Sequence, residues 1–405
     1  MRVTTSSNLA EAPEVTMPVD LRPTDCLPEL LAAARVAPVV RTRYLDQHAW
    51  IVCDRELVKQ ALTHPKLGKD ITLAPDWMRK PGQMVTAMPP PEYARMMITS
   101  DGENHSRIRR LHAPVLSPRN TERWGKRVAT LADELLDELD SGDNAEVNVV
   151  TDYTHKVPLA FTSEMLGLPP GAERRLHDIT EVMLYSADYA LRQQAVEELF
   201  EAVQDWVRNP AGLYDGVITG LLASSDEEDV TVTEGEVIVW TLSLVINGYE
   251  TTGSLISAAL YEALRRPVRE RPHTDEDIAA WIEEALRVQP PVPHTTWRFA
   301  LEDLSLGGYL IPKGAPVQVS IAAANRDPNE DTDGFDAERR GRGHLSFGRG
   351  VHYCIGAPLA RLQAQIALHG FLQRFPRARL SADTAPQWES EWMIRRMSVL
   401  PALLA

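Results

Sequence analysis

Three glycines flank one cysteine in the stretch FGRGVHYCIGAPLAR, which spans residues 347–361: Gly348, Gly350 and Gly356. Glycine lets the backbone take a positive φ or approach a flat surface closely. A helix is predicted from about Pro358 to Phe375, so its N-terminal dipole would point back toward the sulfur of Cys354. Both features favour a thiolate, which is what an axial metal or haem ligand requires. From composition and periodicity alone, a buried structural cysteine beside a glycine turn is the preferred interpretation.

A second pair of residues that could take part in chemistry is the acid Glu250 and the alcohol Thr251. They lie in a short polar stretch of an otherwise apolar helix. Thr233 starts a capping box, and nothing in the sequence stops this helix before Pro267. That predicts about 32 residues and roughly 50 Å of helix through the middle of the protein. An acid beside a hydroxyl there suits proton delivery in a site that excludes water.

The remaining pattern predicts many helices and a few small sheets. Two β-rich runs predict a hairpin, 39–44 and 49–53, and helical spacing covers most of 104–209. Another helix begins at Thr274 and ends before Pro290, and the alternating stretch 304–321 predicts more sheet with a turn at Lys313 and Gly314. This order favours a mainly α (α+β) fold over a repeated βαβ arrangement.

Composition limits the class of protein. The 405 residues are 44% hydrophobic and carry a net charge of -15, which disfavours nucleic acid or an anionic membrane as partner. The three cysteines do not form a disulfide framework, and the N-terminus shows neither a signal peptide nor an anchor. We therefore expect a cytoplasmic monomer with a flexible tail over 1–20 and a single catalytic domain over 21–405.

The stretch around the cysteine resembles the haem-binding signature of the cytochrome P450 family, F-G-x-G-x-H-x-C-x-G-x-x-L-A-R. Nine positions match it: Phe347, Gly348, Gly350, His352, Cys354, Gly356, Leu359, Ala360 and Arg361. The resemblance extends from about Pro38 to the C-terminus. It implies the cytochrome P450 fold, with a long central helix and small β-sheets, haem b as cofactor, and Cys354 as the ligand to iron. It also implies that Phe347, Gly348 and Gly356 belong to the cofactor-binding loop.

Further motifs of the family occur in the same order. HSRIR resembles the motif that holds haem propionates, which implies His105 and Arg109, and the resemblance adds Arg298 and His352 to this set. EALR implies a supporting pair beneath the cysteine loop, Glu284 and Arg287, joined by Arg339 from FDAER. The preceding segment is shorter than usual in the family, which weakens the Arg339 assignment. Taken singly, each of these charges is more often a solvated surface group, and the pair more often a surface i, i+3 ion pair.

NGYETT resembles the family's oxygen-activation motif, in which Glu250 is the acid and Thr251 the hydroxyl that deliver protons. Asn247 departs from the usual Ala or Gly at its position. Two interpretations stay open, namely a hydrogen bond to substrate or water and a bond within the helix.

The resemblance also places a substrate pocket. Its expected lining includes a methionine-rich loop, the end of a helix, the central helix and two later turns: Trp77, Met78, Met84, Met88, Met183, Tyr185, Val245, Asn247, Gly248, Val292 to Thr295, Met393 and Ile394. These mostly apolar residues suit a lipophilic substrate. Each is equally compatible with ordinary core packing.

The implied function is a monooxygenase that activates dioxygen to hydroxylate or epoxidise a lipophilic small molecule in secondary metabolism, such as a polyketide, terpenoid or peptide. Alternatives are oxidative coupling, desaturation or rearrangement, and a non-catalytic haem binder. The resemblance implies electrons from NAD(P)H through a ferredoxin and its reductase. Arg107, Arg110 and Arg349 are candidates for the docking patch, with ordinary solvated arginines as an equal alternative.

Overall fold

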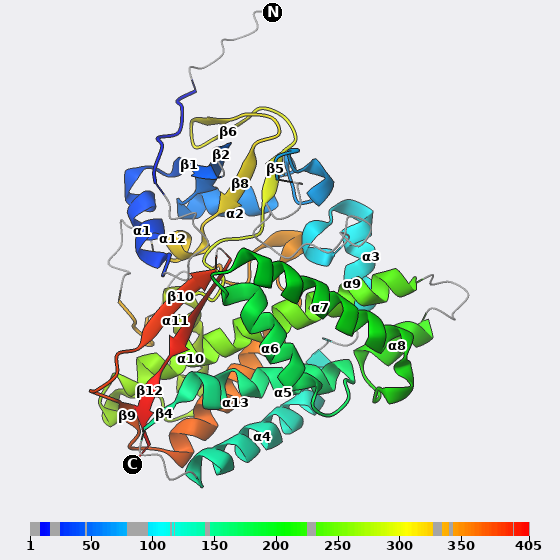
Figure 1. Ribbon diagram of the computed structural model, residues 1–405. Coiled ribbons are helices and arrows are strands. Elements are labelled where there is room, and N and C mark those ends of the chain that lie inside the picture. Colours follow the sequence, from blue (N-terminus) through cyan, green and yellow to red (C-terminus); the bar gives the residue numbers. More distant parts are fainter. Residues whose placement is uncertain are drawn as a thin grey trace, which may run out of the picture.

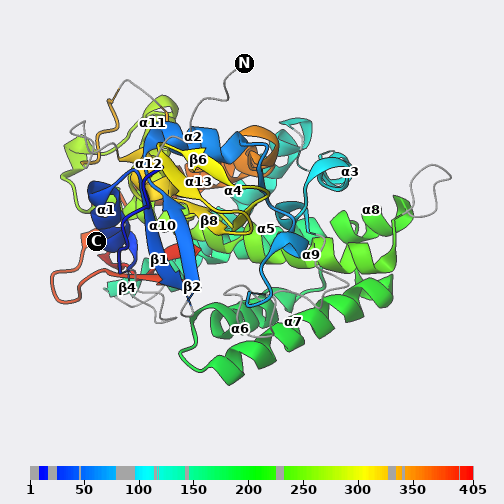
Figure 2. The ribbon, with the colours of Figure 1, turned by 90° about the horizontal axis from the view of Figure 1, so that it is seen from above.

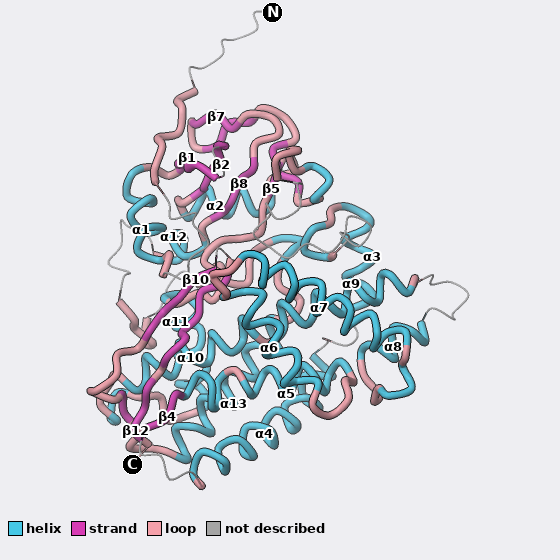
Figure 3. The backbone as a smooth tube through the Cα atoms, viewed as in Figure 1, coloured by secondary structure: helices cyan, strands magenta, loops and turns pink. Residues whose placement is uncertain are grey.

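The computed structural model describes residues 9–16, 25–44, 47–78, 96–113, 116, 118–141, 146–224, 232–326, 334–339, 343–391 and 393–404, with the backbone alone at 118–122, 224 and 391. Strands lie in two regions, one near the N-terminus and one toward the C-terminus, and helices make up most of the rest (Figures 1 and 3). Met84 and Met88 lie outside the described residues.

The helices are α1 (Leu27–Val36), α2 (Arg55–Thr63), α3 (Gly102–His112), α4 (Pro118–Asp140), α5 (Lys156–Leu166), α6 (Ala172–Tyr185), α7 (Tyr189–Arg208), α8 (Val217–Ser224), α9 (Glu234–Gly248), α10 (Glu250–Leu264), α11 (Asp275–Val288), α12 (Ile321–Asn325) and α13 (Ala357–Arg374). The largest cluster of buried apolar side chains draws on the helices from α3 to α11 and on α13. Its formation follows from the amphipathic spacing of these helices, since each buries one stripe against its neighbours.

The strands form four small sheets. Five strands lie in the order β1-β2-β8-β5-β3: β1 (Val39–Tyr44), β2 (Gln47–Val52), β8 (Pro316–Val319), β5 (Arg298–Ala300) and β3 (Leu67–Gly68). The others are β6 (Leu304–Leu306) with β7 (Tyr309–Ile311), β4 (Glu146–Asn148) with β12 (Pro401–Leu403) and β9 (Arg379–Leu380), and β10 (Gln387–Glu391) with β11 (Ile394–Val399).

The predicted hairpin is confirmed, because β1 and β2 pair antiparallel from Val39 with Val52 to Tyr44 with Gln47. The predicted turn at Lys313 and Gly314 is also confirmed, and Gly314 has a φ of +79° there. The small sheets therefore follow the alternation of the sequence, and β5 and β8 hold the segment around Arg298 in place.

The predicted long central helix is confirmed in its extent, from the Thr233 cap to Leu264 before Pro267, but it contains one interruption. The capping box of Thr233 with Glu236 starts α9 as expected, but the helix is interrupted at Tyr249 and resumes as α10. The hydroxyls of Thr251 and Thr252 donate to the carbonyls four residues earlier, at 3.0 and 3.2 Å. Such side-chain bonds compete with the backbone for helix carbonyls and bend helices. The two halves still run end to end through the middle of the molecule (Figures 1 and 2).

Within the described ranges, no helix combines the length and apolar character needed to cross a bilayer.

Candidate active site

The loop before α13 presents Cys354 on a tight turn. The backbone N–H of Cys354 donates to the carbonyl of Phe347 at 2.9 Å. Gly348 and Gly350 have φ values of +74° and +77°, as predicted. Gly356 has a negative φ of -83°, and a Cβ there would lie 3.9 Å from the cysteine sulfur. Gly356 thus lies directly beside the sulfur, and a Cβ there would be in ordinary van der Waals contact with it.

The thiol of Cys354 is not ionised by its helix position alone. Although the side chain is exposed, the protein packed around the sulfur desolvates it and raises the pKa of the thiol. The N–H groups of Gly356 and Ala357 and the guanidinium of Arg109 lower that pKa only in part. The N–H groups at the start of α13 thus favour the thiolate, as the sequence indicates, but desolvation outweighs them in the free thiol. A coordinated metal ion would deprotonate it outright.

Beneath this loop, Glu284 and Arg287 of α11 form a buried bidentate pair, with distances of 2.8 and 2.6 Å. Arg287 also donates to the carbonyls of Asn325 and Gly334 at 3.2 and 2.7 Å. The alternative of a solvated surface pair is therefore wrong. The Arg287 guanidinium thus has a carboxylate partner and two carbonyl acceptors. A buried charge needs such partners, because burial removes its hydration.

The third contact of Glu284 comes from the backbone N–H of Asp336, at 2.8 Å. For Arg339, the structure gives a bond from its own N–H to the carbonyl of Asp336 at 3.2 Å, and its place beside the pair stays a prediction.

Asn325 continues this support toward the cysteine loop. Its side chain donates to Ser346 Oγ at 2.9 Å and accepts from the N–H of Leu345 at 2.8 Å. Ser346 Oγ in turn donates to the carbonyl of Leu286 in α11 at 2.6 Å. These bonds join α11 directly to the residue before Phe347, so they fix the start of the glycine loop.

The four predicted propionate residues come from three separate segments, namely α3, β5 and the cysteine loop, and partly converge. The rings of His105 and His352 lie 4.2 Å apart, and His352 Nε2 is 3.4 Å from Asp101 Oδ1. Arg109 donates to the carbonyl of Tyr353 at 2.9 Å. Arg298 is buried on β5 and donates to the carbonyls at the end of α2 at 3.3 and 3.2 Å.

Two nitrogen atoms in this group lack acceptors. His105 Nε2 and Arg298 Nη1 are buried and have no hydrogen-bond partner in the part of the chain that the structure describes. Desolvation lowers the pKa of Arg298 to about 10 and that of His352 to about 4. Buried donors without acceptors are costly, so this group is suited to binding an anion such as a carboxylate.

Sequence reasoning missed two charged members of this group, Lys69 and Asp101. Burial, with the nearby charge of Arg298, holds the pKa of Lys69 well below its usual value. Burial acts to raise the pKa of Asp101, but hydrogen bonds from His352 and from the N–H groups of Lys69 and Asp70 hold it at about 2. No sequence motif marks either residue, because their role arises from the approach of β3 to the start of α3.

Glu250 lies in a buried polar cluster. Tyr185 donates to its Oε1 at 2.8 Å, Arg396 lies 3.3 Å away, and His155 Nε2 lies 3.5 Å away. Burial acts to raise the pKa of Glu250, but His155, Arg396 and Tyr185 outweigh it and hold the pKa at about 2. Glu250 is therefore an anion in this arrangement. Arg396 and His155 could not be identified from the sequence, because they come from segments far from Glu250 in the chain.

Thr251 and Asn247 lie on a more accessible face of the central helices than Glu250. The side chain of Asn247 is exposed and that of Thr251 half-buried, whereas Glu250 has 1% of its surface exposed. The Nδ2 group of Asn247 donates to the carbonyl of Ser243 at 2.7 Å. The acid and the hydroxyl of the predicted pair thus occupy different environments.

The other predicted pocket residues divide into two groups. Four are fully packed in the core: Met78, Met183, Val245 and Ile394. Others are partly accessible: Trp77, Gly248, Val292, Thr295 and Met393. Backbone bonds from Thr295 to Val319 and from Arg395 to Pro291 hold the segment 291–295 beside the end of β8 and the start of β11. Core packing is therefore the better interpretation of the first group.

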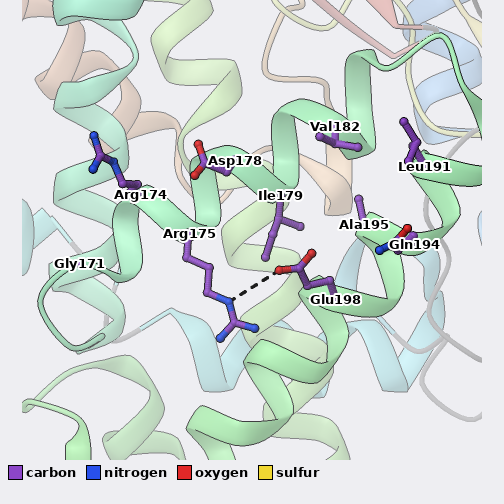
Figure 4. A pocket seen from close by; sticks show the side chains of 10 residues that line it. All are labelled: Gly171, Arg174, Arg175, Asp178, Ile179, Val182, Leu191, Gln194, Ala195 and Glu198. Atoms are coloured by element: carbon purple, nitrogen blue, oxygen red, sulfur yellow. Dashed lines mark ion pairs between the residues drawn. The ribbon is translucent and has the colours of Figure 1, made fainter.

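A separate hollow of about 540 Å³ lies between α6 and α7 (Figure 4). Its lining combines charged side chains, such as Arg175 and Glu198 at 4.0 Å, with the apolar Val182 and Leu191. None of the predicted pocket residues is among its described lining residues. This hollow is thus distinct from the cysteine loop.

The predicted basic patch is smaller than expected. Arg107 pairs with Glu236 at 2.5 Å and lies 5.8 Å from the ring centroid of Trp240. Arg110 and Arg349 are exposed, and Val351 and Tyr353 beside Arg349 expose 71% and 39% of their surface. Arg107 therefore acts within the fold and does not belong to the patch.

Comparison with known proteins identifies the family. The family model described as Cytochrome P450 matches residues 278–401. The 6-deoxyerythronolide B hydroxylase of Saccharopolyspora erythraea is 33% identical over 91% of this chain and 93% of its own length. The mycinamicin IV hydroxylase/epoxidase of Micromonospora griseorubida is 31% identical over 90% of this chain and 92% of its own length.

Solved structures agree with this relationship. The cytochrome P450 enzyme CxnD, described for C-S bond formation in chuangxinmycin biosynthesis, superimposes with a TM-score of 0.85 and 26% identity over 99% of both chains. The resemblance first carried by the cysteine loop therefore extends over the whole fold. The chain belongs to the cytochrome P450 family of haem-dependent monooxygenases.

Proposed function

We propose that Cys354 is the protein's ligand to the haem iron and that the chain hydroxylates or epoxidises a lipophilic small molecule of secondary metabolism. The observation that carries this proposal is the pair of buried nitrogen atoms without a hydrogen-bond partner among the described residues, His105 Nε2 and Arg298 Nη1, near His352, two residues before Cys354. A cofactor that carries carboxylates and an electrophilic metal would satisfy these donors and ionise the thiol. When bound, haem supplies the dioxygen chemistry.

In this proposal the surrounding residues hold the cofactor. His105, Arg109, Arg298 and His352 donate to its carboxylates, because guanidinium and imidazole N–H groups match carboxylate oxygens. The glycines Gly348 and Gly356 leave room beside the sulfur. Glu284 and Arg287, with Arg339 as their proposed third member, hold the loop from below. At the start of this loop, the Phe347 ring packs against the Arg361 guanidinium, with 4.4 Å between the ring centroid and Cζ.

We assign proton delivery to Glu250 and Thr251. Thr251 offers a hydroxyl on the accessible face, and Glu250 offers a carboxylate one residue away. Because His155, Arg396 and Tyr185 hold Glu250 as an anion, its carboxylate would act by accepting hydrogen bonds from the groups that pass the proton toward Thr251. Exclusion of water by the buried cluster favours such directed transfer.

The substrate is proposed to be polyketide-like. The relatives named above as hydroxylases act, by those names, on 6-deoxyerythronolide B and mycinamicin IV. The accessible residues Asn247, Gly248, Val292, Thr295 and Met393 are proposed as pocket lining. Oxidative coupling remains a second candidate because the structural neighbour CxnD forms a C-S bond.

The proposed electron donors are a ferredoxin and an NAD(P)H-dependent reductase. The exposed Arg110 and Arg349, with the exposed Val351 and Tyr353, provide a basic and partly apolar surface beside the cysteine loop. An acidic partner with a small apolar contact suits this surface. We further propose that a single cytoplasmic domain, 21–405, acts as a monomer.

The test is the absorption spectrum of purified, haem-loaded protein after reduction and addition of carbon monoxide. A strongly red-shifted, thiolate-type band is expected for the natural chain and should be lost in Cys354→Ser. The matched control Cys26→Ser changes a cysteine elsewhere and should keep the band. A histidine-like band in the natural chain would refute the assignment of Cys354.

Two further measurements separate the alternatives. Oxidation in the presence of labelled dioxygen should place label in the product, whereas coupling or desaturation leaves the product unlabelled. A protein that binds carbon monoxide but consumes no NAD(P)H with any candidate substrate and competent partners would instead be a haem binder.

A further inference from the structure

The accessible side chains of the central helices form a short stripe. From Val237 to Leu264 nearly every residue is buried, and the exceptions are Ser243, Leu244, Ile246, Asn247, Gly248, Thr251 and Tyr261. Three polar members are spaced four residues apart: Ser243, Asn247 and Thr251. That spacing places them on one side of the helix axis. Asn247 is the one exposed member of the stripe, and the others are half-buried.

The orientation of the Asn247 carboxamide follows from its contacts. One amide atom lies 2.7 Å from the carbonyl oxygen of Ser243, and a carbonyl oxygen can only accept. That atom must therefore be Nδ2, and the same group lies 3.4 Å from Ser243 Oγ. Both donor positions of the amide are directed into its own helix. Oδ1 is left as an acceptor with no partner among the described residues.

Thr251 presents the same polarity one turn further along. Its hydroxyl donates to the carbonyl of Asn247 at 3.0 Å, so in this arrangement the lone pairs of the oxygen face outward. Asn247 and Thr251 thus both present acceptor oxygens on the stripe. The stripe also has two half-buried apolar members, Leu244 and Ile246.

We propose that Asn247 is a specificity-determining residue that accepts a hydrogen bond from an O–H or N–H group of the substrate. This inference rests on the proposed function, in which the stripe borders the substrate pocket. The recognised donor then lies about one helical turn, roughly 5 Å, from Thr251. A substrate without a donor at that point leaves the fixed Oδ1 desolvated and unpaired, which is the basis of discrimination by a polar site.

The test uses haem-loaded protein and a set of azole probes: 4-phenylimidazole and its three hydroxyphenyl isomers. Azole binding to haem iron is followed by the absorption shift. The natural chain should bind one hydroxyl isomer about 2- to 10-fold more tightly than the parent, the range of a net hydrogen bond. Asn247→Leu, which keeps similar volume without an acceptor, should reduce that ratio to about 1. Asn247→Ala also removes the acceptor but introduces no branched side chain, and it should likewise reduce the affinity ratio to about 1.

Ser243→Ala is the matched control, because it keeps the backbone carbonyl that orients Asn247 and should retain the preference. The inference is overturned if the natural chain prefers no hydroxyl isomer, or if both Asn247 variants keep the full preference. If the azoles produce no absorption shift in the natural chain, the haem proposal itself fails. The carbon monoxide spectrum of each variant verifies that haem is bound before the ratios are compared.

Discussion

Arg396 is expected to be the most sensitive single charge in the fold. It lies on β11 with 6% of its surface exposed and contacts carboxylates from three other segments. It lies 3.3 Å from Glu250 and 2.7 Å from Glu389, and it forms a two-pronged pair with Glu181 of α6. Arg396→Met keeps much of the side-chain volume but leaves Glu250 buried without this cation.

The magnitude follows from the pKa of Glu250, which is about 2 against an ordinary value of 4.5. At 1.36 kcal/mol for each unit, the net shift corresponds to about 3 kcal/mol, and it is shared among His155, Arg396 and Tyr185. Removing Arg396 takes away its part of this shift and also leaves Glu181 and Glu389 without their cation, so we expect a total loss of roughly 3 to 5 kcal/mol, as for breaking one side of a buried ion pair. For a chain of 405 residues, such a loss lowers Tm by about 4 to 6 °C.

The pH dependence has a definite sign. The pKa of Glu250 is depressed by folding, so its contribution is full above the unfolded value of 4.5 and is lost as the pH falls toward 2. The difference in stability between the natural chain and Arg396→Met should therefore be largest at neutral pH. It should narrow when the pH is lowered to 4.

The assay is thermal unfolding at pH 7 and pH 4. The double variant Arg396→Met with Glu250→Gln removes the unpaired carboxylate and should recover part of the loss. Arg374→Met is the surface control, because Arg374 pairs with the exposed Asp137 at 2.6 Å and should change Tm little. Equal shifts in the surface and buried variants, or no recovery in the double variant, would refute the reasoning.

Three other predictions follow from the site. Arg298→Leu removes a buried donor and should accelerate haem loss by about 10- to 100-fold, measured by transfer to an acceptor protein, and an unchanged rate would contradict its proposed role. Gly350→Ala should lower Tm more than Gly314→Ala: both glycines have positive φ, but a Cβ at Gly350 would lie 2.7 Å from Thr63 Cγ2, whereas nothing lies within 4 Å at Gly314. Equal decreases in Tm would contradict this prediction, because they would mean that the cysteine loop accommodates the added Cβ at no extra cost. Thr251→Ala should consume NAD(P)H with less product, and an unchanged ratio would argue against proton delivery.

Local chemistry was determined by the sequence alone. The glycine-flanked cysteine and the capping boxes at Thr233 and Thr274 depend on residues within a few positions of one another. The Glu284 and Arg287 pair is likewise one helical turn apart. Such contacts are fixed by backbone geometry, so spacing in the sequence predicts them. Their burial was not predictable in the same way, because it depends on which elements pack around them.

Only the tertiary structure decided the environment of each charge. Arg396 is 146 positions from Glu250 and Tyr185 is 65 positions away, so no local pattern connects them. Lys69 and Asp101 join the histidine cluster for the same reason, through the approach of β3 to α3. Tyr249, at the interruption of the central helix, likewise bonds through its hydroxyl with Thr180 of α6, which is 69 positions away. Sequence spacing therefore identified the reactive groups, and long-range packing set their charge, burial and orientation.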